Sequence, residues 1–343
     1  MVICIMDKDA KDMEEHFKWE INGLKRSWGQ YDQEMLRSYL VQGVEDPRIN
    51  IQSILTRHFL IERLFGEQFA EMIEQELRFG LIVNWLLRLL DTSVSARGLH
   101  AVLDSLLDGK DKAEEVKIPG YVSETFAGLA VPNYICDLLS WAPIESTDVP
   151  IPDYLLKTFQ KIWQEVLEGE RAERISVVEP GCGSANDYRF IDAYSMGRFL
   201  DYTGFDLCEK NVRNAKQMFP NVRFEAGNIL EIDAPDYAFN YCFIHDVFEH
   251  LSVEAMEAAI SEVCRVTRQE VCAGFFNMYS GEEHVVKAVD YYHRNKLSMG
   301  RTKAIFEQYA SCVQVIHIDA FLKSKFNCSD THNKGAYTFV AGM

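Results

Sequence analysis

The sequence is short of positive charge. Among its 343 residues, 35 are Lys or Arg and 52 are Asp or Glu, so the formal net charge is −17. Proteins that bind nucleic acids usually present basic surfaces, because contacts with phosphates supply much of the affinity. The acidic balance therefore disfavours nucleic acid as the partner of this chain.

Long apolar runs and paired cysteines are also missing. The longest apolar stretch, Phe79–Leu90, contains Asn84 and Arg88 and is too short to span a bilayer, so we expect a buried helix and no membrane partner. The apolar run Met1–Met6 ends too soon for a signal peptide. The nine cysteines are scattered without a C-x-x-C pair, which is typical of reduced thiols. We therefore expect a cytoplasmic protein.

The first 145 residues are helical in pattern. Apolar residues recur at helical spacing, most clearly in a long segment from about Glu67 to Leu90 and a shorter one over Ala96–Leu107. The stretch Trp141–Pro152 contains three prolines with Ser and Thr, which favours a linker. We predict two domains. An all-α N-terminal domain over residues 1–145 caps a cleft or mediates self-association as a homodimer, and a second domain covers residues 146–343.

The step Asp46-Pro47-Arg48 predicts a helix start, because proline is tolerated in the first turn. The helix that follows carries four polar side chains that either face a cofactor cleft or form a solvated, salt-bridged helix face. These residues are Arg48, Asn50, Gln52 and Arg57. We favour the solvated face.

The most informative stretch is Ile175–Asp187, which reads ISVVEPGCGSAND. Its β-branched start predicts a buried parallel strand, and the glycine-rich turn after it lets the backbone approach a bound cofactor. A dinucleotide fingerprint would need a third glycine where Asn186 stands. Glu179 would also place a carboxylate beside a pyrophosphate. The same carboxylate suits a ligand with a cationic end, such as an amino acid or a sulfonium.

A second strand, roughly Phe199–Phe205, ends in Asp206, which lies 23 positions (206 − 183) after the last glycine. An acid at that place can accept hydrogen bonds from ribose hydroxyls. A helix over Asn211–Phe219 and a strand over Val222–Ala226 lead to Gly227-Asn228-Ile229, where an amide beside an apolar side chain could hold an adenine ring.

In order and spacing these features resemble the class I S-adenosylmethionine-dependent methyltransferases, over about the C-terminal half of the chain. The resemblance implies an α/β, Rossmann-like seven-stranded sheet whose last strand is antiparallel. It implies S-adenosylmethionine as cofactor and S-adenosylhomocysteine as product. The remaining strands are expected over Tyr237–Ile244, Glu270–Phe276, Val313–Ile318 and Ala336–Ala341, with a helix over Val253–Val266 and a turn or loop within Cys328–Gly335.

The cofactor contacts carry over from the family by matching positions. The residues expected to touch the methionine, ribose and adenine portions, or to lie at the end of the fourth strand, are Glu179, Gly181, Gly183, Asp206, Leu207, Asn228, Ile229, His245 and Asp246. A small-molecule substrate would bind beside them. Tyr291 and Tyr292 are candidates to cover it, although core packing is an equal alternative.

The stretch Asp246–His250 resembles an E-x-x-E-H pattern that binds a divalent metal in some members of the superfamily. A metal would use Asp246, Glu249, His250 and His293, and this donor set suits Mn, Fe, Co or Zn better than Mg. The first acid is Asp rather than Glu, and its shorter reach makes us favour a metal-free site. Glu249, His250 and His293 are then the candidate catalytic residues, with a histidine as general base.

The sequence therefore predicts a methyltransferase that acts on a small metabolite, with O-methylation favoured and a natural product, sugar or quinone as the acceptor. Two alternatives stay open. The fold could bind S-adenosylmethionine only as a scaffold or sensor, or it could catalyse metal-assisted methylation of RNA.

Overall fold

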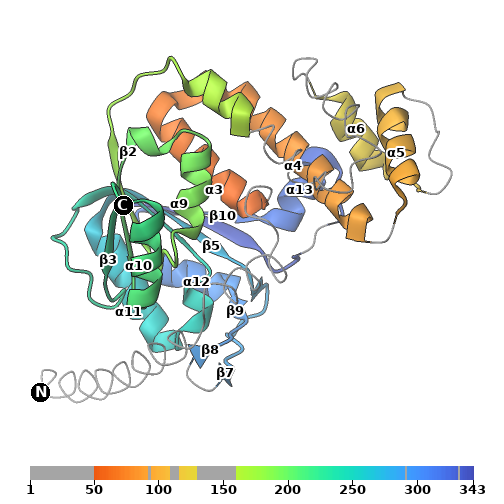
Figure 1. Ribbon diagram of the computed structural model, residues 1–343. Coiled ribbons are helices and arrows are strands. Elements are labelled where there is room, and N and C mark those ends of the chain that lie inside the picture. Colours follow the sequence, from red (N-terminus) through yellow and green to blue (C-terminus); the bar gives the residue numbers. More distant parts are fainter. Residues whose placement is uncertain (1–49, 92–93, 109–115, 130–159, 290–291, 331–332) are drawn as a thin grey trace, which may run out of the picture.

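Seven strands form the central sheet of the protein (Figure 1). The computed structural model describes residues 50–91, 94–108, 116–129, 160–289, 292–330 and 333–343. The strand order is β10-β11-β5-β4-β1-β2-β3. All neighbours pair in parallel except β11, which is antiparallel to β5 and β10. This confirms the predicted Rossmann-like sheet. The strands are β1 (Ile175–Pro180), β2 (Leu200–Asp206), β3 (Arg223–Ala226), β4 (Phe239–His245), β5 (Thr267–Phe275), β10 (Cys312–His317) and β11 (Tyr337–Gly342).

Helices lie before the sheet in sequence and between its strands. The N-terminal ones are α3 (Ile51–Phe65), η1 (Gly66–Phe69), α4 (Ala70–Asp91), α5 (Ala96–Asp108) and α6 (Gly120–Ala127). Those of the sheet region are α9 (Asn186–Ala193), η2 (Gly197–Phe199), α10 (Glu209–Met218), η3 (Phe248–His250), α11 (Val253–Val266), α12 (Met299–Phe306) and α13 (Ile318–Phe326). Short two-residue strands, β6 (Met278–Tyr279), β7 (Ala288–Val289), β8 (Tyr292–His293) and β9 (Leu297–Ser298), follow β5. Within the described ranges no helix is both long and apolar enough to cross a membrane.

The apolar periodicity located the long elements and missed the short ones. The predicted helices at Glu67–Leu90, Ala96–Leu107 and Val253–Val266 correspond to α4, α5 and α11. The helices α6, α9, α12 and α13 span only eight or nine residues each, and a helical period is hard to recognise over two turns. The last two strands pair in antiparallel fashion, with the unpredicted helix α13 between them, and the expected loop within Cys328–Gly335 follows that helix.

Both faces of the sheet are covered, which explains the continuous apolar runs in its strands. In β4, Tyr241 and Phe243 join one buried cluster and Cys242 and Ile244 join the other. The first cluster includes residues of α3, α4, α9, α10 and α13, and the second includes residues of α11 and α12. Alternate residues of a strand therefore point to opposite faces of the sheet, and those in the first cluster point toward the face that α3 covers.

Helix α3 begins later than predicted, and its polar side chains are not solvated. Its N-cap is Asn50, whose side chain accepts hydrogen bonds from the backbone of Gln52 and Ser53. Pro47 and Arg48 lie outside the described residues. Gln52 is only 2% exposed and Arg57 only 1%. The expected solvation is therefore wrong for these two residues, because the helix packs directly on the sheet (Figure 1), whereas the expected salt bridge is found for Arg57, which pairs with Glu76.

A buried carboxylate fixes α3 to its neighbours. Glu76 on α4 accepts hydrogen bonds from the guanidinium of Arg57, from His58 Nε2 at 2.7 Å and from Trp163 Nε1 at 3.1 Å. Burial alone would raise the pKa of Glu76, but Arg57 and His58 lower it to about 2. The carboxylate is therefore ionised, and it joins α3, α4 and the helix containing residues 160–167.

The N-terminal helices differ in their distance from the sheet. Helices α3, α4, α5 and α6 all contribute to the buried cluster that contains strand residues, but α5 and α6 lie at the far end of α4, away from the sheet (Figure 1). The division between residues 145 and 146 stays a prediction, because residues 130–159 lie outside the described part of the chain.

Candidate functional site

The glycine-rich turn after β1 forms a backbone cradle at the carboxyl edge of the sheet. Gly181 and Gly183 have φ values of 70° and 54°, in the left-handed region that favours glycine. A Cβ added to Gly181 would lie 2.6 Å from Cγ2 of Val247, which follows β4. The two loops at the ends of β1 and β4 therefore meet with no room for a side chain. Such a crevice beside a parallel strand end is where open α/β sheets bind nucleotide cofactors.

Asp206 holds this turn in place. Its Oδ2 accepts a hydrogen bond from Gly183 N at 2.9 Å, and its Oδ1 accepts from Cys208 N at 2.7 Å and from Asn211 Nδ2 at 3.3 Å. The ribose contact expected of Asp206 stays a prediction, but the side chain has a second task that the sequence did not reveal. It links the end of β2 to the turn after β1.

Three acids make the base of the cradle attractive to a cation. Glu179 is 2% exposed and accepts a hydrogen bond from the hydroxyl of Tyr202. Burial raises the pKa of Glu179 well above its usual value, and the nearby Asp187 and Asp206 raise it further. A positive charge placed beside Glu179 would be stabilised by the negative charges of Asp187 and Asp206. The sulfonium and ammonium of S-adenosylmethionine fit this requirement, as the sequence predicted from Glu179.

The residues expected around the adenine lie at the ends of β2 and β3. Leu207 and Asn228 are half-buried, and Ile229 packs against the second apolar cluster. The Asn228 Oδ1 accepts a hydrogen bond from Leu230 N at 3.1 Å, so the asparagine also shapes its own turn. Strand β3 pairs directly with β2, which brings this turn beside Asp206.

His245 joins the cradle to the N-terminal helices. At the end of β4, its Nδ1 lies 2.7 Å from Asp187 Oδ2 and its Nε2 lies 2.8 Å from Thr56 Oγ1 on α3. The Thr56 hydroxyl is also placed to donate to the Gln52 carbonyl at 3.1 Å, so it can accept from Nε2. Burial lowers the pKa of His245, but Asp187 outweighs burial and raises it above its ordinary value. The Nδ1 side thus faces the Asp187 carboxylate, and Nε2 shares a hydrogen bond with the Thr56 hydroxyl.

The stretch after His245 places the candidate catalytic residues at the end of β4. Asp246 has a φ of 52°, and its Oδ1 lies 3.3 Å from His250 Nε2. His250 Nδ1 lies 3.1 Å from the carbonyl oxygen of His293, which belongs to β8. Tyr292 packs edge-on against the His250 ring at 5.7 Å, and Tyr291 lies outside the described residues. The structure thus brings Asp246, His250 and the backbone of His293 together.

Glu249 points away from that pair. It is 2% exposed, and its Oε1 accepts a hydrogen bond from Phe276 N at 2.6 Å, just after β5. Its Oε2 is buried and has no hydrogen-bond partner among the described residues. Burial, and then Asp246, raise the pKa of Glu249 to about 7, although His250 opposes the shift.

The charge state of His250 differs from that of a free histidine. Burial lowers its pKa, but its contacts with Asp246 and Glu249 raise it to about 9. Both of its ring nitrogens face acceptors, so at neutral pH the imidazole is a cation and a hydrogen-bond donor. Within the described ranges, no group of three or more His, Cys, Asp or Glu side chains is arranged to hold a metal.

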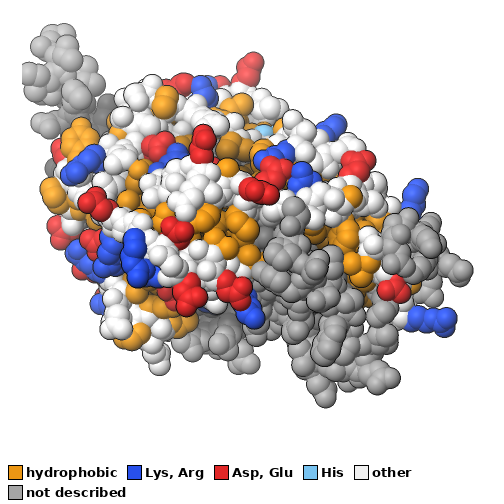
Figure 2. Space-filling view, turned by 90° about the horizontal axis from the view of Figure 1, so that it is seen from above, with side chains coloured by type: hydrophobic (Ala, Val, Ile, Leu, Met, Phe, Trp, Pro, Cys, Tyr) orange, Lys and Arg blue, Asp and Glu red, His pale blue; other side chains and the backbone are white. Residues whose placement is uncertain are grey.

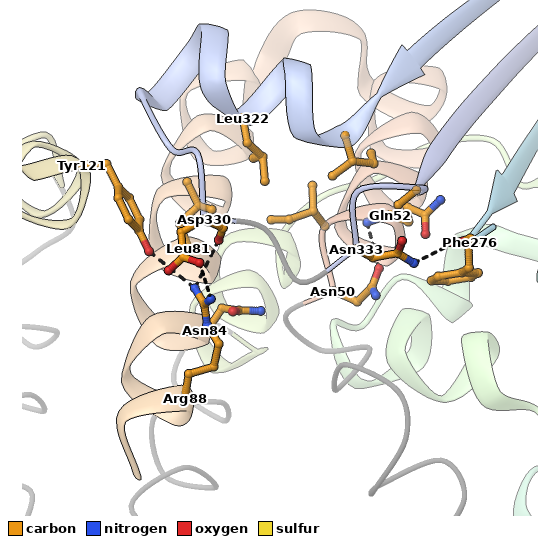
Figure 3. Close-up of a pocket in the computed structure, with 13 residues that line it drawn as sticks. Asn50, Gln52, Leu81, Asn84, Arg88, Tyr121, Phe276, Leu322, Asp330 and Asn333 are labelled. Atoms are coloured by element: carbon orange, nitrogen blue, oxygen red, sulfur yellow. Dashed lines mark hydrogen bonds and ion pairs between the residues drawn. The ribbon is translucent and has the colours of Figure 1, made fainter. Parts of the chain in front are cut away.

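A pocket opens at the same edge of the sheet, between the N-terminal helices and the loop before β11 (Figure 3). Its volume is about 500 Å³ when the open mouth is included. Polar side chains line both of its ends, and apolar ones lie between them. The lining residues are Asn50, Ile51, Gln52, Leu81, Asn84, Arg88, Tyr121, Phe276, Ile318, Leu322, Asp330, Asn333 and Ala336.

Sequence reasoning did not identify this pocket. The available signal was the pair Asn84 and Arg88, two polar residues four apart within an apolar helix, which places them on one face. Gln52 and Asn333 gave no local signal, because only the packing of α3 on β5 and β11 brings them together.

Comparisons with known proteins agree with this architecture. Residues 177–270 match a family model described as a methyltransferase domain. No curated protein matches the sequence. Among solved structures, similarity is found to an S-adenosylmethionine-dependent methyltransferase from Methanosarcina mazei, with 12% identity over 52% of this chain and 96% of that one and a TM-score of 0.38. A second similar structure is that of a 1,6-didemethyltoxoflavin-N1-methyltransferase from Burkholderia thailandensis, which contains S-adenosylhomocysteine. The identity is 14% over 53% of this chain and 75% of that one, and the TM-score is 0.37.

These identities and TM-scores are low, so the assignment depends on the family match and on the chain's own features. The strand order, the antiparallel β11 and the glycine cradle beside Asp206 are those expected from the resemblance. Residues 177–270 therefore form a methyltransferase domain, and the sheet around them has the strand order expected of the class I S-adenosylmethionine-dependent methyltransferases. S-adenosylmethionine is the cofactor expected of such a domain, and the acids of the cradle fit its positive charge.

Proposed function

We propose that this enzyme transfers a methyl group to a small metabolite, with oxygen as the favoured acceptor atom. The observation that carries the proposal is the pocket beside Phe276, on the same sheet edge as the glycine cradle. Its lining combines apolar side chains with a few polar ones, which is typical of small-molecule sites. The charge supports the same conclusion, because Lys and Arg are interspersed with Asp and Glu on the face shown in Figure 2 rather than gathered into one basic surface.

Each part of the edge has a proposed role. The bound cofactor supplies an electrophilic methyl group. Gly181 and Gly183 hold its methionine portion, Asp206 with Leu207 its ribose, and Asn228 with Ile229 its adenine. Glu179, His245 and Asp246 complete the cleft around it. The main contribution of the chain is then alignment of the acceptor with the methyl group.

Among the three candidate catalytic residues, the geometry favours Glu249 as the proton acceptor. Its Oε2 lacks a partner within the described residues, and a pKa of about 7 suits a general base at neutral pH. His250 is fully protonated there, so we propose that it orients Asp246 and stabilises developing negative charge. His293 contributes its carbonyl oxygen, which holds the His250 ring.

Two alternatives are distinguished by experiment. A scaffold or sensor would bind S-adenosylhomocysteine and show no turnover with any metabolite pool. A metal-assisted RNA methyltransferase would lose activity reversibly with a chelator and would use RNA as substrate. We expect chelation to leave turnover unchanged. A reversible loss, together with weaker metal binding after Asp246→Ala or His250→Ala, would instead assign a metal to these residues.

The decisive first measurement is calorimetric titration of the full-length protein with S-adenosylhomocysteine and, separately, with NAD⁺. We expect binding of the first and none of the second. Preferential binding of NAD⁺ would overturn the proposal. Mass spectrometry of ligands retained by the purified protein, followed by methylation assays on metabolite pools, would then identify the acceptor.

We also propose that the protein is cytoplasmic, which its scattered cysteines support. The N-terminal helices are proposed to cap the cleft or to mediate a homodimer. Light scattering of the intact protein would measure the oligomeric state. Removal of residues 1–145 should abolish turnover, and full activity of the truncated chain would contradict the capping role.

A further inference from the structure

We propose that Tyr202 on β2 is a positioning residue of the cofactor site. Its hydroxyl holds the carboxylate of Glu179 in place, and the charge of that carboxylate recognises the ammonium group of the cofactor. This inference rests on the proposed function and adds the residue pair that recognises the amino-acid end of the ligand. It follows from the partners of the acids in the cradle, from the path of the Tyr202 side chain and from the charge of Glu179.

The three acids of the cradle differ in the partners that they already have. Asp206 accepts three hydrogen bonds, and Asp187 faces the ring of His245 at 2.7 Å. Glu179 accepts one hydrogen bond, from the Tyr202 hydroxyl to its Oε2. Neither a second hydrogen bond nor an ion pair reaches its carboxylate from the described residues. Glu179 is therefore the acid with the most capacity left for a positively charged ligand.

The Tyr202 side chain reaches Glu179 by crossing a glycine. Tyr202 and Gly204 are two residues apart on β2, so both face the same side of the sheet. Gly204 is the partner of Glu179 in the register of β1 and β2. A Cβ added to Gly204 would lie 2.7 Å from the hydroxyl oxygen of Tyr202. The absence of a side chain at position 204 therefore leaves the space through which the hydroxyl meets the carboxylate.

Aromatic packing fixes the ring that carries this hydroxyl. Tyr202 is buried, and the rings of Tyr188, Phe224 and Phe243 surround it with centroids 4.5, 5.6 and 6.3 Å from its own. These neighbours belong to α9, β3 and β4, so three separate elements determine where the ring lies. A ring held in this way can hold the Glu179 carboxylate in turn.

The hydrogen bond from Tyr202 also favours the charged form of Glu179. Burial, and then the charge of Asp187, raise the pKa of Glu179 well above its usual value, which favours the neutral acid. The hydrogen bond from Tyr202 opposes that rise, because a donor to a carboxylate stabilises its ionised form. Tyr202 thus supports both the position and the negative charge of Glu179.

The ammonium group is the part of the cofactor that we assign to this carboxylate. The proposed function places the methionine portion on the glycine turn that directly follows Glu179. An ammonium group has N–H donors that a carboxylate oxygen can accept, whereas a sulfonium has none. S-adenosylhomocysteine keeps the ammonium group and lacks the sulfonium, so its binding reports the proposed contact by itself.

The test is calorimetric titration of the full-length protein with two ligands. One is S-adenosylhomocysteine, and the other is its deaminated analogue, in which a hydrogen atom replaces the ammonium group. We expect the wild type to bind the first about 10-fold more tightly or better. Tyr202→Phe should raise the Kd of S-adenosylhomocysteine about 10-fold and should not raise that of the analogue. A general loss of order in the cradle would weaken both ligands, so this split separates positioning from a structural role.

Tyr188→Phe is the matched control. Its ring packs against that of Tyr202, but its hydroxyl makes no hydrogen bond to Glu179, so both Kd values should stay nearly unchanged. Gly204→Ala is a second route to the same effect, because its methyl group would displace the Tyr202 hydroxyl. It should weaken S-adenosylhomocysteine more than the analogue. Thermal melts verify that each variant folds.

A double-variant cycle tests whether Tyr202 acts through Glu179. Glu179→Gln removes the charge and keeps an oxygen that can accept from Tyr202, so it should give the same selective loss. Addition of Tyr202→Phe to Glu179→Gln should then weaken S-adenosylhomocysteine binding no further. Additive losses would show that Tyr202 acts by another route and would overturn the inference.

The remaining outcomes separate this inference from the proposed function. Equal wild-type affinities for the two ligands would overturn the inference, as would equal losses for both ligands in Tyr202→Phe or no loss for either. In each of these cases, binding of S-adenosylhomocysteine by the wild type would leave the proposed function intact. The absence of that binding would overturn the proposed function itself.

Discussion

The carboxyl edge of the sheet divides into two halves of different chemistry. The half formed by the ends of β1, β2 and β3 is acidic. Its surface consists of the backbone of two glycines, with the carboxylates of Glu179, Asp187 and Asp206 beside them. The half formed by β4, β5 and β11 is lined by amides and histidines and opens into a pocket. We propose that the first half holds the cationic cofactor and that the second half holds the methyl acceptor. The two halves are separate because β1, β2 and β3 lie on one side of the sheet and β4, β5 and β11 on the other.

Helix α3 is the element that reaches both halves. Gln52 contacts the carboxyl end of β5 and the start of β11, and Thr56 contacts His245 at the end of β4. Arg57 stacks on Tyr194, which follows α9, with its guanidinium 4.1 Å from the ring centre. Residues within two turns of α3 therefore contact both halves of the sheet edge and hold them in a fixed relation to each other.

Glu76→Gln should loosen α3 and so disturb both halves of the sheet edge. Among the variants considered, it should cause the largest loss of unfolding free energy. It leaves Arg57 buried without its counter-charge, which typically costs about 3–5 kcal/mol of unfolding free energy. Urea denaturation measures the change, with Glu71→Gln on the exposed side of α4 as the control. A loss no larger than that of the control would show that Glu76 does not hold α3.

The lowered pKa of Glu76 also predicts how the stability of the protein depends on pH. Its folded-state pKa of about 2 lies below the ordinary value of 4.5, so its contribution to stability is present above pH 4.5 and is lost as the pH falls toward 2. The wild-type protein should lose stability across this window. The Glu76→Gln variant should show a flatter dependence there, and an identical slope would contradict the assignment.

Gly181→Val should break the cofactor half alone. The residue would need a φ of 70° and would collide with Val247, so we expect the turn to shift and the Kd of S-adenosylhomocysteine to rise about 100-fold. Calorimetry measures the change. Gly300→Ala is the control, because an added Cβ there meets no atom within 4 Å and needs no positive φ. Equal affinities of the two variants would mean that the turn does not contact the cofactor.

Asp206→Asn should weaken the same half to a smaller degree. An amide at this position would turn an NH₂ group toward Gly183 N or Cys208 N, so that donors face donors. The expected loss in S-adenosylhomocysteine binding is about 1.5–3 kcal/mol, which is roughly 10–100-fold in Kd. Asp201→Asn, on the same strand but exposed, should bind like the wild type. Unchanged binding of Asp206→Asn would remove this residue from the site.

Thr56→Val tests the junction between the halves and has the smallest expected effect. It removes the hydroxyl that shares a hydrogen bond with His245 Nε2 while keeping the volume, so the buried Nε2 loses its partner. We expect a loss of S-adenosylhomocysteine affinity of about 3–10-fold. Thr302→Val is the control, since the buried Thr302 hydroxyl has no hydrogen-bond partner among the described residues. Equal behaviour of the two variants would argue against a coupling through His245.

The cofactor half could be predicted from the sequence because its determinants are local or evenly spaced. A β-branched strand, a glycine turn and an acid at the end of the next strand stand in order within about 30 residues, and parallel pairing brings consecutive strand ends to one edge. The antiparallel last strand was likewise predictable. The second task of Asp206, holding Gly183 N, depends on the exact turn geometry and has no signal in the sequence.

Tertiary structure alone decided the acceptor half. Gln52 contacts partners 223 and 285 positions away, and Thr56 contacts one 189 positions away, so no local pattern indicates them. Polar residues on a helix are usually solvated, which explains why burial of Gln52 and Arg57 was not expected. The sequence by itself thus determined the sheet and the glycine turn at its carboxyl edge. The pocket, the buried carboxylate Glu76 and the direction of Glu249 arose only when α3 and α4 packed on the sheet, because burial and hydrogen-bond partners are properties of the packed chain.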